Sequence, residues 1–282
     1  MIPAAFDYEV ADSVEQALEL LTAKPDAKLL AGGHSLLPAM KLRFSRPAAL
    51  IDIARIPGLD TVTDGGDHVA IGALVRHCEL ERDAIVRAEL PLLAYAAGLA
   101  GDRQVRHRGT IGGSLAHADP AGDLPAIALT LDAEIVARGP SGERTIAAAD
   151  FFRGIYTTAL APDELIVQVR VPKTAGAGWS YLKFRRRSID WAMVGVAAVV
   201  RANGSIDEAR ISLVNMGPRP VRASAVEDAL HGGSGDGVAA AAAHAAEGTD
   251  PPTDTWASSD FRRHLAPVLT EQAVNEALSR TG

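Results

Sequence analysis

Hydrophobic residues recur with a helical period near the N-terminus of the chain. From Val14 to Leu21 they fall at i, i+3, i+4 and i+7, and Ser13 with Gln16 has the pattern of a capping box. These features predict a helix over residues 13–21. Pro91 opens a segment that is apolar on nearly every side, which indicates a buried helix that Gly101 ends.

Hydrophobic residues at a two-residue period predict β-strands in the first 175 residues. The segment 164–171 has the alternation of a strand, which is expected to carry Leu165, Val167, Val169 and Val171 on one face. The turn sequence at 139–142 joins two strands into a hairpin. The other strands are expected at 28–31, 48–53, 68–72, 134–138 and 144–147, and short helices at 76–81 and 127–131.

Residues 174–178 have the composition of a linker, and the order of elements changes after them. Three strands are expected at 180–186, 194–201 and 209–214, with a turn at Asn203-Gly204. Helices follow at 223–230 and 265–278, on either side of a low-complexity Gly and Ala tract at 232–246. Because strands and helices are segregated here, the sequence predicts a separate C-terminal α+β domain.

Composition narrows the class of partner. The 282 residues include 28 basic and 35 acidic side chains, a net charge of −7, which disfavours nucleic acid and anionic membrane surfaces. No secretory signal and no membrane-spanning run are recognised, so a cytoplasmic setting is expected. Cys78 is the single cysteine, which excludes an internal disulfide, a cysteine-based zinc site and an iron–sulfur cluster held by this chain alone.

Two glycine-rich segments carry the candidate chemistry. Ala31-Gly32-Gly33-His34-Ser35-Leu36-Leu37-Pro38 is the first motif, and Gly109-Thr110-Ile111-Gly112-Gly113-Ser114, continuing to Pro125, is the second motif. Paired glycines allow positive φ and close approach of a ligand to the main chain, and successive free N–H groups form an anion-binding nest. Two such loops, about eighty residues apart, suggest two arms that close on one phosphorylated ligand of dinucleotide size.

Other phosphate-binding and hydrolytic motifs are missing from the sequence. The Gly232–Gly237 tract lacks the third glycine of a Rossmann fingerprint, and no Gly-Lys-Ser/Thr of a P-loop occurs. There is no H-E-x-x-H zinc motif and no G-x-S-x-G nucleophile elbow. The two glycine motifs therefore remain the best indication of function.

Together these two motifs resemble the FAD-binding motifs of the medium, flavoprotein subunit of molybdenum hydroxylases, of the carbon-monoxide dehydrogenase and xanthine dehydrogenase type. The similarity extends to Ile51-Asp52-Ile53, Val69–Ala73, Lys183-Phe184, Asp190-Trp191-Ala192 and Phe261–Leu265. It implies an α+β fold: an FAD-binding domain of the vanillyl-alcohol oxidase (PCMH) type at 1–175, with subdomains at about 1–56 and 57–175. A C-terminal α+β domain at 178–282 is implied beside it.

The resemblance also implies roles for individual residues. Main-chain N–H groups of the first motif (Ala31, Gly32, Gly33, His34, Ser35, Leu36) and of Ile111, Gly112, Gly113 and Ser114 would bind the FAD pyrophosphate. Ser35, Thr110 and Ser114 would add hydroxyl contacts, and Asp123 would accept from ribityl or ribose hydroxyls. Ile166 would flank the ring systems. Lys183 would lie beside the flavin, where a cation stabilises the anionic reduced form.

Simpler structural interpretations stay open for several residues. His34 could contribute only its backbone amide, and Lys183 could be a solvated residue at a strand edge. Asp52 is expected to form a turn at a strand end, and Cys78 to be a small buried residue. Trp191 is expected in the core, and Arg185-Arg186-Arg187 at a solvated or partner-facing strand end.

The implied function is that of an FAD-carrying electron-transfer subunit of an oxidoreductase. Its partners would be a large molybdopterin subunit and a small subunit with two [2Fe–2S] clusters, arranged as a dimer of heterotrimers. NAD+, a quinone or oxygen would be the external acceptor. A stand-alone FAD oxidase or dehydrogenase, with Tyr156 or Tyr181 as acid/base, is an alternative, as is a scaffold that has lost FAD.

Overall fold

In the computed structural model, which describes residues 1–281, the N-terminal segment forms a three-stranded parallel sheet with β3 in the middle. Its strands and helices are β1 (Asp7–Val10), α1 (Val14–Ala23), β2 (Ala27–Leu30), α2 (Leu36–Lys41) and β3 (Ala49–Asp52). The Ser13 hydroxyl accepts a hydrogen bond from the Gln16 amide, as the capping pattern predicts. Leu18 and Leu21 pack against this sheet in a small core.

The middle of the chain forms a five-stranded antiparallel sheet in the order β4-β5-β10-β6-β7. Its strands are β4 (Val62–Asp64), β5 (His68–Gly72), β6 (Glu134–Gly139), β7 (Gly142–Ala147) and β10 (Leu165–Pro172). A separate two-stranded ribbon pairs β8 (Phe152–Gly154) with β9 (Thr157–Thr158). The 139–142 turn closes the hairpin as predicted, and Gly142 has φ of 110° there.

The prediction that Leu165, Val167, Val169 and Val171 share one face of β10 is wrong. The register shifts between Ile166 and Gln168 where β10 pairs with β6. A β-bulge of this kind reverses which face later side chains point to. Leu165 and Val167 consequently pack in the N-terminal core, whereas Val169 and Val171 pack in the middle core.

Seven helices accompany the middle sheet, and all of them except α6 contribute buried residues to the largest core. They are α3 (His77–Leu80), α4 (Ala84–Glu89), α5 (Pro91–Leu99), α6 (Arg103–Arg106), α7 (Ile111–His117), α8 (Asp123–Thr130) and α9 (Ala148–Phe151). The short helix expected at 127–131 begins earlier, at Asp123, and all eight residues of α8 are buried. Pro91 occupies the first turn of α5, where its missing N–H leaves no helical hydrogen bond unmade.

The C-terminal segment is a four-stranded antiparallel sheet, in the order β11-β12-β13-β14, with helices against it. The strands are β11 (Gly178–Phe184), β12 (Val194–Asn203), β13 (Ser205–Val214) and β14 (Val221–Arg222). The helices are α10 (Ser224–Leu230), η1 (Gly235–Gly237), α11 (Val238–Ala242), η2 (Ala243–Ala246) and α12 (Ser259–Leu278). Gly204 has φ of 80° in the predicted turn between β12 and β13.

Three details of the C-terminal segment differ from the sequence expectations. The Gly and Ala tract is partly helical, and Val238 and Ala241 are buried in the C-terminal core. Helix α12 starts six residues before Leu265 because the Ser258 hydroxyl caps the Phe261 amide. Trp191 is 66% exposed and does not lie in the core.

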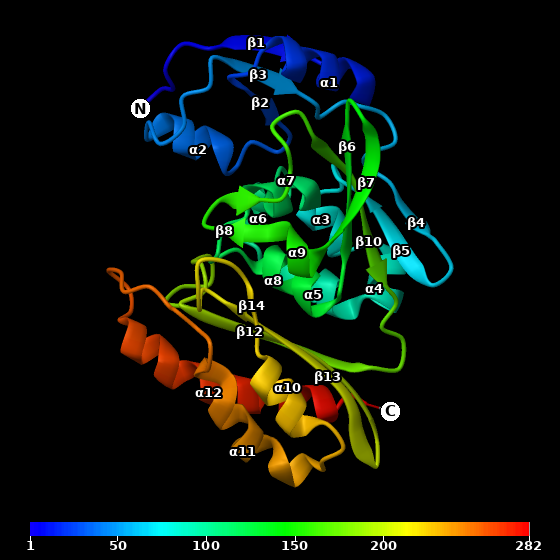
Figure 1. The fold of residues 1–282 in the computed structure, drawn as a ribbon, viewed down its shortest axis with the longest axis vertical. Helices are drawn as coiled ribbons and strands as arrows, with labels where there is room; N and C mark the ends of the chain where they lie inside the picture. The colour runs from blue at the N-terminus through cyan, green and yellow to red at the C-terminus, as the bar shows by residue number, and fades with distance from the viewer. Residues whose placement is uncertain (282) are drawn as a thin grey trace.

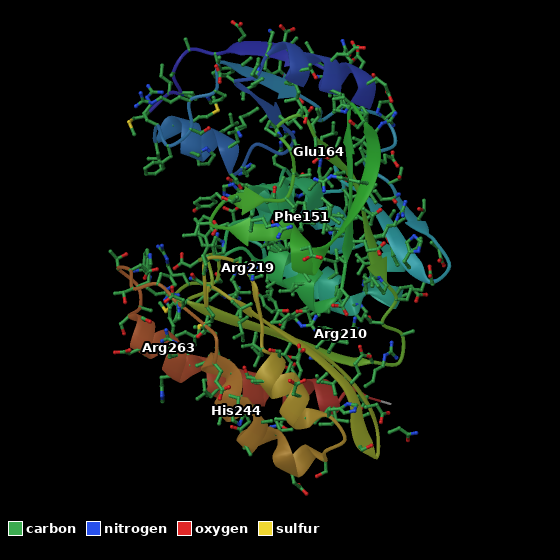
Figure 2. The ribbon with its side chains drawn as sticks, viewed as in Figure 1. Phe151, Glu164, Arg210, Arg219, His244 and Arg263 are labelled. Carbon is green, nitrogen blue, oxygen red and sulfur yellow. The ribbon has the colours of Figure 1, made fainter. Side chains whose placement is uncertain are left out.

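Figure 1 shows the parallel sheet, the middle sheet with its helices, and the C-terminal sheet following one another along the long axis. Polar contacts join the middle and C-terminal parts. Arg210 forms an ion pair with Asp132 at 3.0 Å, and Arg219 donates to the carbonyl oxygen of Phe152 at 3.2 Å. Figure 2 labels Arg210 and Arg219 at this boundary.

Candidate functional site

The first motif is the connection between β2 and α2. Gly33 has φ of 77°, the left-handed conformation that the paired glycines were expected to permit. Within residues 1–281, the amide N–H groups of Gly32, Gly33, His34, Ser35 and Leu36 donate to no other residue. The side chains of His34 and Ser35 are exposed. The first motif therefore offers five consecutive main-chain donors to a ligand.

The second motif differs from the expected loop, because Ile111–His117 forms the helix α7. Gly112 and Gly113 do not have positive φ, so that explanation of the glycine pair is wrong for this motif. The reason for Gly112 is close packing: a Cβ there would lie 2.6 Å from the Cβ of Ala73. The Thr110 hydroxyl caps the helix by accepting from the Gly113 amide at 3.1 Å.

The amides of the second motif are already engaged within the chain. Ile111 donates to the carbonyl oxygen of Val75 at 3.0 Å, and Gly112 donates to that of Ala73 at 2.9 Å. Ser114 donates to the carbonyl oxygen of Thr110 at 3.0 Å. The bonds of Ile111 and Gly112 fix α7 on the segment that follows β5, so the first motif is the richer source of free main-chain donors.

The two motifs meet in space as the sequence predicts. A Cβ on Gly32 would lie only 2.1 Å from the carbonyl oxygen of Arg108, so the main chains of the two segments are in contact. A Cβ on Gly113 would lie 4.0 Å from the Cβ of Ala31. Arg76 and Arg108, together with Ala31 and Thr110, line a small hollow at this junction. Free amides beside two arginines suit a negatively charged group such as a diphosphate.

Asp123 and Lys183 form a buried ion pair between the middle and C-terminal parts of the chain. The Lys183 ammonium lies 2.9 Å from one carboxylate oxygen of Asp123, and the two side chains are 3% and 8% exposed. The Tyr181 hydroxyl donates to the other oxygen, and Lys183 also donates to the carbonyl oxygen of Leu99. Burial, followed by the Asp123 charge, raises the pKa of Tyr181 well above its usual value.

This arrangement corrects the simpler interpretation of Lys183, which is not a solvated edge residue. It also gives Asp123 a structural reason to be a carboxylate, without any ligand hydroxyl. Within residues 1–281, no hydrogen bond or ion pair connects Asp123 or Lys183 to the first motif. Ile166 lies in β10 and is buried in the same core as Ile111 and Leu115 of α7.

A pair of aromatic side chains at the end of the second motif was not singled out as a unit by the sequence. The rings of His117 and Tyr156 lie 4.9 Å apart, and the Tyr156 amide donates to the carbonyl oxygen of Ala118. Ala118 and Tyr156 have φ of 50° and 53°, which is uncommon for residues other than glycine. Burial lowers the pKa of His117 and raises that of Tyr156. The sequence holds one local signal for this pair, which is His117 within the second motif, but its ring partner Tyr156 lies 39 residues later in the chain.

Other predicted features are also visible in the structure. Asp52 ends β3 and accepts from the Ala54 amide at 2.8 Å, which makes it the expected turn former. Cys78 is buried. Residues 1–281 contain no group of three or more His, Cys, Asp or Glu side chains placed to hold a metal ion. In the same part of the chain, no helix has the length and apolar character needed to cross a membrane.

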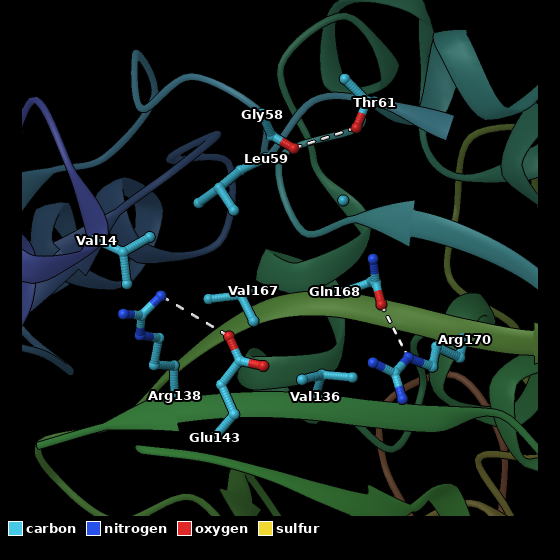
Figure 3. A pocket seen from close by; sticks show the side chains of 11 residues that line it. Val14, Gly58, Leu59, Thr61, Val136, Arg138, Glu143, Val167, Gln168 and Arg170 are labelled. Atoms are coloured by element: carbon cyan, nitrogen blue, oxygen red, sulfur yellow. Dashed lines mark hydrogen bonds and ion pairs between the residues drawn. The ribbon is translucent and has the colours of Figure 1, made fainter. Parts of the chain in front are cut away.

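A hollow of about 280 Å³ lies elsewhere, between α1 and the face of the middle sheet (Figure 3). It is lined by residues such as Val14, Leu59 and Val167 and by two arginines, whose guanidinium groups contact neighbouring side chains. Arg138 pairs with Glu15 at 2.6 Å, and Arg170 donates to Gln168 at 2.9 Å. No residue of either glycine motif lines this hollow, so it is not the candidate site.

Comparisons with known proteins identify both parts of the chain. Residues 4–174 match the FAD binding domain in molybdopterin dehydrogenase, and residues 179–277 match the CO dehydrogenase flavoprotein C-terminal domain. The carbon monoxide dehydrogenase medium chain of Hydrogenophaga pseudoflava is 44% identical over 285 residues, which cover 99% of each chain. Subunit alpha of the 6-hydroxypseudooxynicotine dehydrogenase complex of Paenarthrobacter nicotinovorans is 40% identical, covering 99% of this chain and 97% of that one.

Solved structures agree with the sequence matches. A chain of the Hydrogenophaga pseudoflava carbon monoxide dehydrogenase that lacks the Mo-pyranopterin moiety superposes with a TM-score of 0.98 and 45% identity, covering 100% of both chains. A chain of quinoline 2-oxidoreductase from Pseudomonas putida 86 superposes with a TM-score of 0.95 and 33% identity, covering 99% of both. The predicted fold class, FAD as the cofactor and the oxidoreductase class are thereby confirmed. The chain belongs to the family of FAD-binding subunits of molybdenum-containing dehydrogenases of the carbon monoxide dehydrogenase type.

Proposed function

We propose that this chain carries FAD and transfers electrons between an iron–sulfur partner subunit and an external acceptor. The observation that supports this most directly is the contact of Gly32 in the first motif with Arg108 and Gly109, where the second motif begins. The N–H groups from Gly32 to Leu36 have no partner within residues 1–281, so they are free to bind the diphosphate of FAD beside this contact. FAD supplies the redox chemistry when it is bound, and this chain supplies binding and orientation.

The first motif is the proposed diphosphate site. The amides from Gly32 to Leu36 donate to phosphate oxygens, and the Ser35 hydroxyl adds a further donor. On the second motif, Ser114 contributes its hydroxyl. Thr110 keeps its hydroxyl proton available because its oxygen accepts from Gly113. The proposed role of Ile111–Ser114 is therefore mainly to place the first motif and to allow close approach of the ligand.

Asp123, Ile166 and Lys183 are proposed to act on the remainder of the cofactor. Each oxygen of Asp123 already accepts one hydrogen bond, but a carboxylate has room for about four, so a ribityl or ribose hydroxyl can be added. The buried charge of Lys183 is held in place by Asp123 and the Leu99 carbonyl oxygen. Ile166 supplies an apolar wall for the ring systems.

The partners proposed are a large molybdopterin subunit and a small [2Fe–2S] subunit, assembled as a dimer of heterotrimers in the cytoplasm. The relatives named above support this, since they are parts of dehydrogenase complexes. The single cysteine of this chain means that any iron–sulfur cluster has to come from another subunit. NAD+, a quinone or oxygen is the proposed acceptor. Residues 1–175 and 178–282 are the proposed domains.

The alternative of a stand-alone oxidase loses one of its two candidate acid/base residues in this structure. The Tyr181 hydroxyl is buried and committed to Asp123, so it is unsuited to proton exchange with a substrate. Tyr156 is exposed and close to the ring of His117.

The test is to purify the chain alone and within its complex, and to measure flavin per protein and turnover with candidate substrates. We expect flavin in both preparations and substrate-dependent flavin reduction only in the complex. Turnover of an organic substrate by the isolated chain would contradict the proposal, as would a colourless protein that does not take up added FAD.

A further inference from the structure

Residues 101–109, which we call the covering segment, pack against helix α3 and lead into the second motif (Figure 1). The covering segment contains α6, and none of its residues is buried. It adds no side chain to the three hydrophobic cores of the protein. A segment with so few buried contacts is able to open while the rest of the protein stays folded.

Side-chain contacts attach the covering segment to α3. The Nε of Arg106 lies 3.5 Å from a carboxylate oxygen of Glu81, which directly follows α3. The Nδ1 of His107 lies 3.6 Å from the sulfur of Cys78, which is buried. These side chains hold the covering segment from its exposed side.

His77 holds the covering segment from the buried side. The His77 amide donates to the carbonyl oxygen of Gly109 at 3.0 Å. A Cβ on Gly109 would lie 2.8 Å from both Cδ2 and Nε2 of the imidazole, so the ring packs directly on the main chain. His77 is 5% exposed, and its Nδ1 has no hydrogen-bond partner within residues 1–281. A buried polar atom without a partner costs stability, so stability alone does not explain an imidazole at this position.

The end of the covering segment is also the part that contacts the first motif. A Cβ on Gly32 would lie 2.1 Å from the carbonyl oxygen of Arg108 and 3.0 Å from the Cα of Gly109. The free amides of the first motif begin at Gly32. If the covering segment opens, these amides lose the main chain that supports them, so opening and FAD binding oppose each other.

Only a neutral imidazole suits this position while the covering segment is in place. Burial, followed by the positive charge of Arg106, lowers the pKa of His77 to about 4. When the segment opens, the imidazole meets water and its pKa returns toward 6.5, so a falling pH favours the open form. Other titratable side chains on α3, α5 and α6, or directly before and after them, are Arg76, Cys78, Glu79, Glu81, Tyr95, Asp102, Arg103 and His107.

We infer that His77 is a positioning residue of the FAD site, whose neutral imidazole holds the covering segment against Gly32 and whose protonation opens the segment and releases FAD. This inference rests on the proposed function and adds to it a local, acid-driven step of flavin release. Cys78, the single cysteine of the chain, reports the opening. Its sulfur is buried against His107, so a maleimide reacts with it when the covering segment moves away.

The experiment uses the flavin-containing complex, purified through a tag on this chain. N-ethylmaleimide is added at pH values from about 7.5 to about 5, and the labelling of Cys78 is followed by peptide mass spectrometry. Each rate is divided by the rate for the urea-unfolded chain at the same pH, and flavin release is followed by fluorescence. The variants are His77→Phe and Glu81→Gln. The control is His244→Gln, because His244 is an exposed histidine of the C-terminal segment that pairs with Glu247.

We expect the normalised labelling rate to increase by about tenfold or more from the highest to the lowest pH, with flavin release increasing in parallel. In His77→Phe both rates should change by less than about twofold, because no group beneath the covering segment is then protonated. His244→Gln should behave as the unmodified complex does. Glu81→Gln removes the ion pair with Arg106 and should raise both rates by about two- to fivefold at every pH.

A labelling rate that stays constant with pH in the unmodified complex would overturn the inference, as would an equal pH dependence in His77→Phe. If His77→Phe does not fold, Glu81→Gln decides, because faster labelling without faster flavin release would also overturn it. Labelling that depends on urea as steeply as the loss of circular dichroism would show that Cys78 is exposed by global unfolding, which is a further contrary result. A complex that contains no flavin at any pH would instead contradict the proposed function.

Discussion

Replacing Lys183 by Met tests the buried ion pair that joins the middle and C-terminal parts of the chain. Met is close in size to the apolar part of the lysine, so the substitution removes the ammonium with little change in packing. Asp123 would then be left with the Tyr181 hydroxyl and the N-terminus of α8 as its remaining favourable interactions. The carboxylate is 8% exposed, so water cannot fully replace the lost partner.

The expected loss follows from the cost of an uncompensated buried charge. Breaking a buried ion pair by removing one partner costs about 3–5 kcal/mol. Because Tyr181 and the helix N-terminus still stabilise Asp123, we expect the lower end, about 3 kcal/mol. For a protein of this size, each kcal/mol corresponds to roughly 2–4 °C in the unfolding midpoint, so the expected decrease is about 6–12 °C.

The assay is thermal unfolding of Lys183→Met and of a matched variant at an exposed pair, Lys24→Met. Lys24 and Glu9 lie 2.6 Å apart, but their side chains are 32% and 42% exposed, so this pair should contribute little to stability. Adding Asp123→Asn to Lys183→Met should recover part of the loss, because no charge is then left buried. A Lys183→Met midpoint within about 2 °C of the Lys24→Met midpoint would refute the reasoning. If Lys183 also lies beside the flavin, the variant should lower the flavin midpoint potential, and an unaltered potential would place Lys183 elsewhere.

Three further predictions concern the two motifs and their surroundings. Gly32→Ala should weaken FAD binding by at least about tenfold in a titration, because its Cβ would overlap the Arg108 carbonyl oxygen. The control is Gly237→Ala, where a Cβ meets open space. Equal FAD affinities of the two variants would count against the contact between Gly32 and Arg108. Gly113→Val should reduce the flavin content of the purified protein, since its side chain would displace the Thr110 cap and enter the space beside Ala31, and full occupancy would be the contrary result. His77 is buried, and burial lowers its pKa from 6.5 to about 4. As the pH falls, the imidazole of His77 is therefore protonated in the unfolded chain before it is protonated in the folded one. The free energy of unfolding should decrease between pH 6.5 and 4 by up to about 3 kcal/mol, and His77→Phe should flatten that slope; an equal slope in the variant would exclude His77 as the cause.

Local sequence patterns were sufficient for elements whose signal lies within a few residues. The Ser13 cap, the 139–142 hairpin and the Asn203-Gly204 turn depend on neighbouring residues only, and all three are present. The meeting of the two motifs was predictable for a different reason. Each glycine pair allows a close approach, and the Gly32 contact with Arg108 is such an approach between the two segments.

The features that the sequence did not predict depend on contacts between distant residues. Two adjacent glycines are poor helix formers, yet Ile111–His117 is helical because Thr110 caps it and Gly112 packs on Ala73. The bulge in β10 is set by its pairing with β6, which no alternation within β10 reveals. Lys183 next to three arginines is typical of a solvated strand end, and only its partner sixty residues earlier makes it a buried charge.

The two glycine motifs contribute to one site in different ways, and the difference lies in which of their main-chain amides are already hydrogen-bonded. A main-chain amide can bind a ligand only if the fold leaves it without a partner, and within residues 1–281 this holds from Gly32 to Leu36. The amides of Ile111 and Gly112 are used to hold α7 against the chain that follows β5, and the amide of Ser114 is used within the helix. Substitutions in the first motif should therefore remove donors or block them directly, whereas those in the second motif should act by moving the first motif away from its ligand. It follows that Gly112→Ala, which meets Ala73, should lower both protein stability and flavin affinity, whereas a substitution that only blocks the first motif should lower flavin affinity alone.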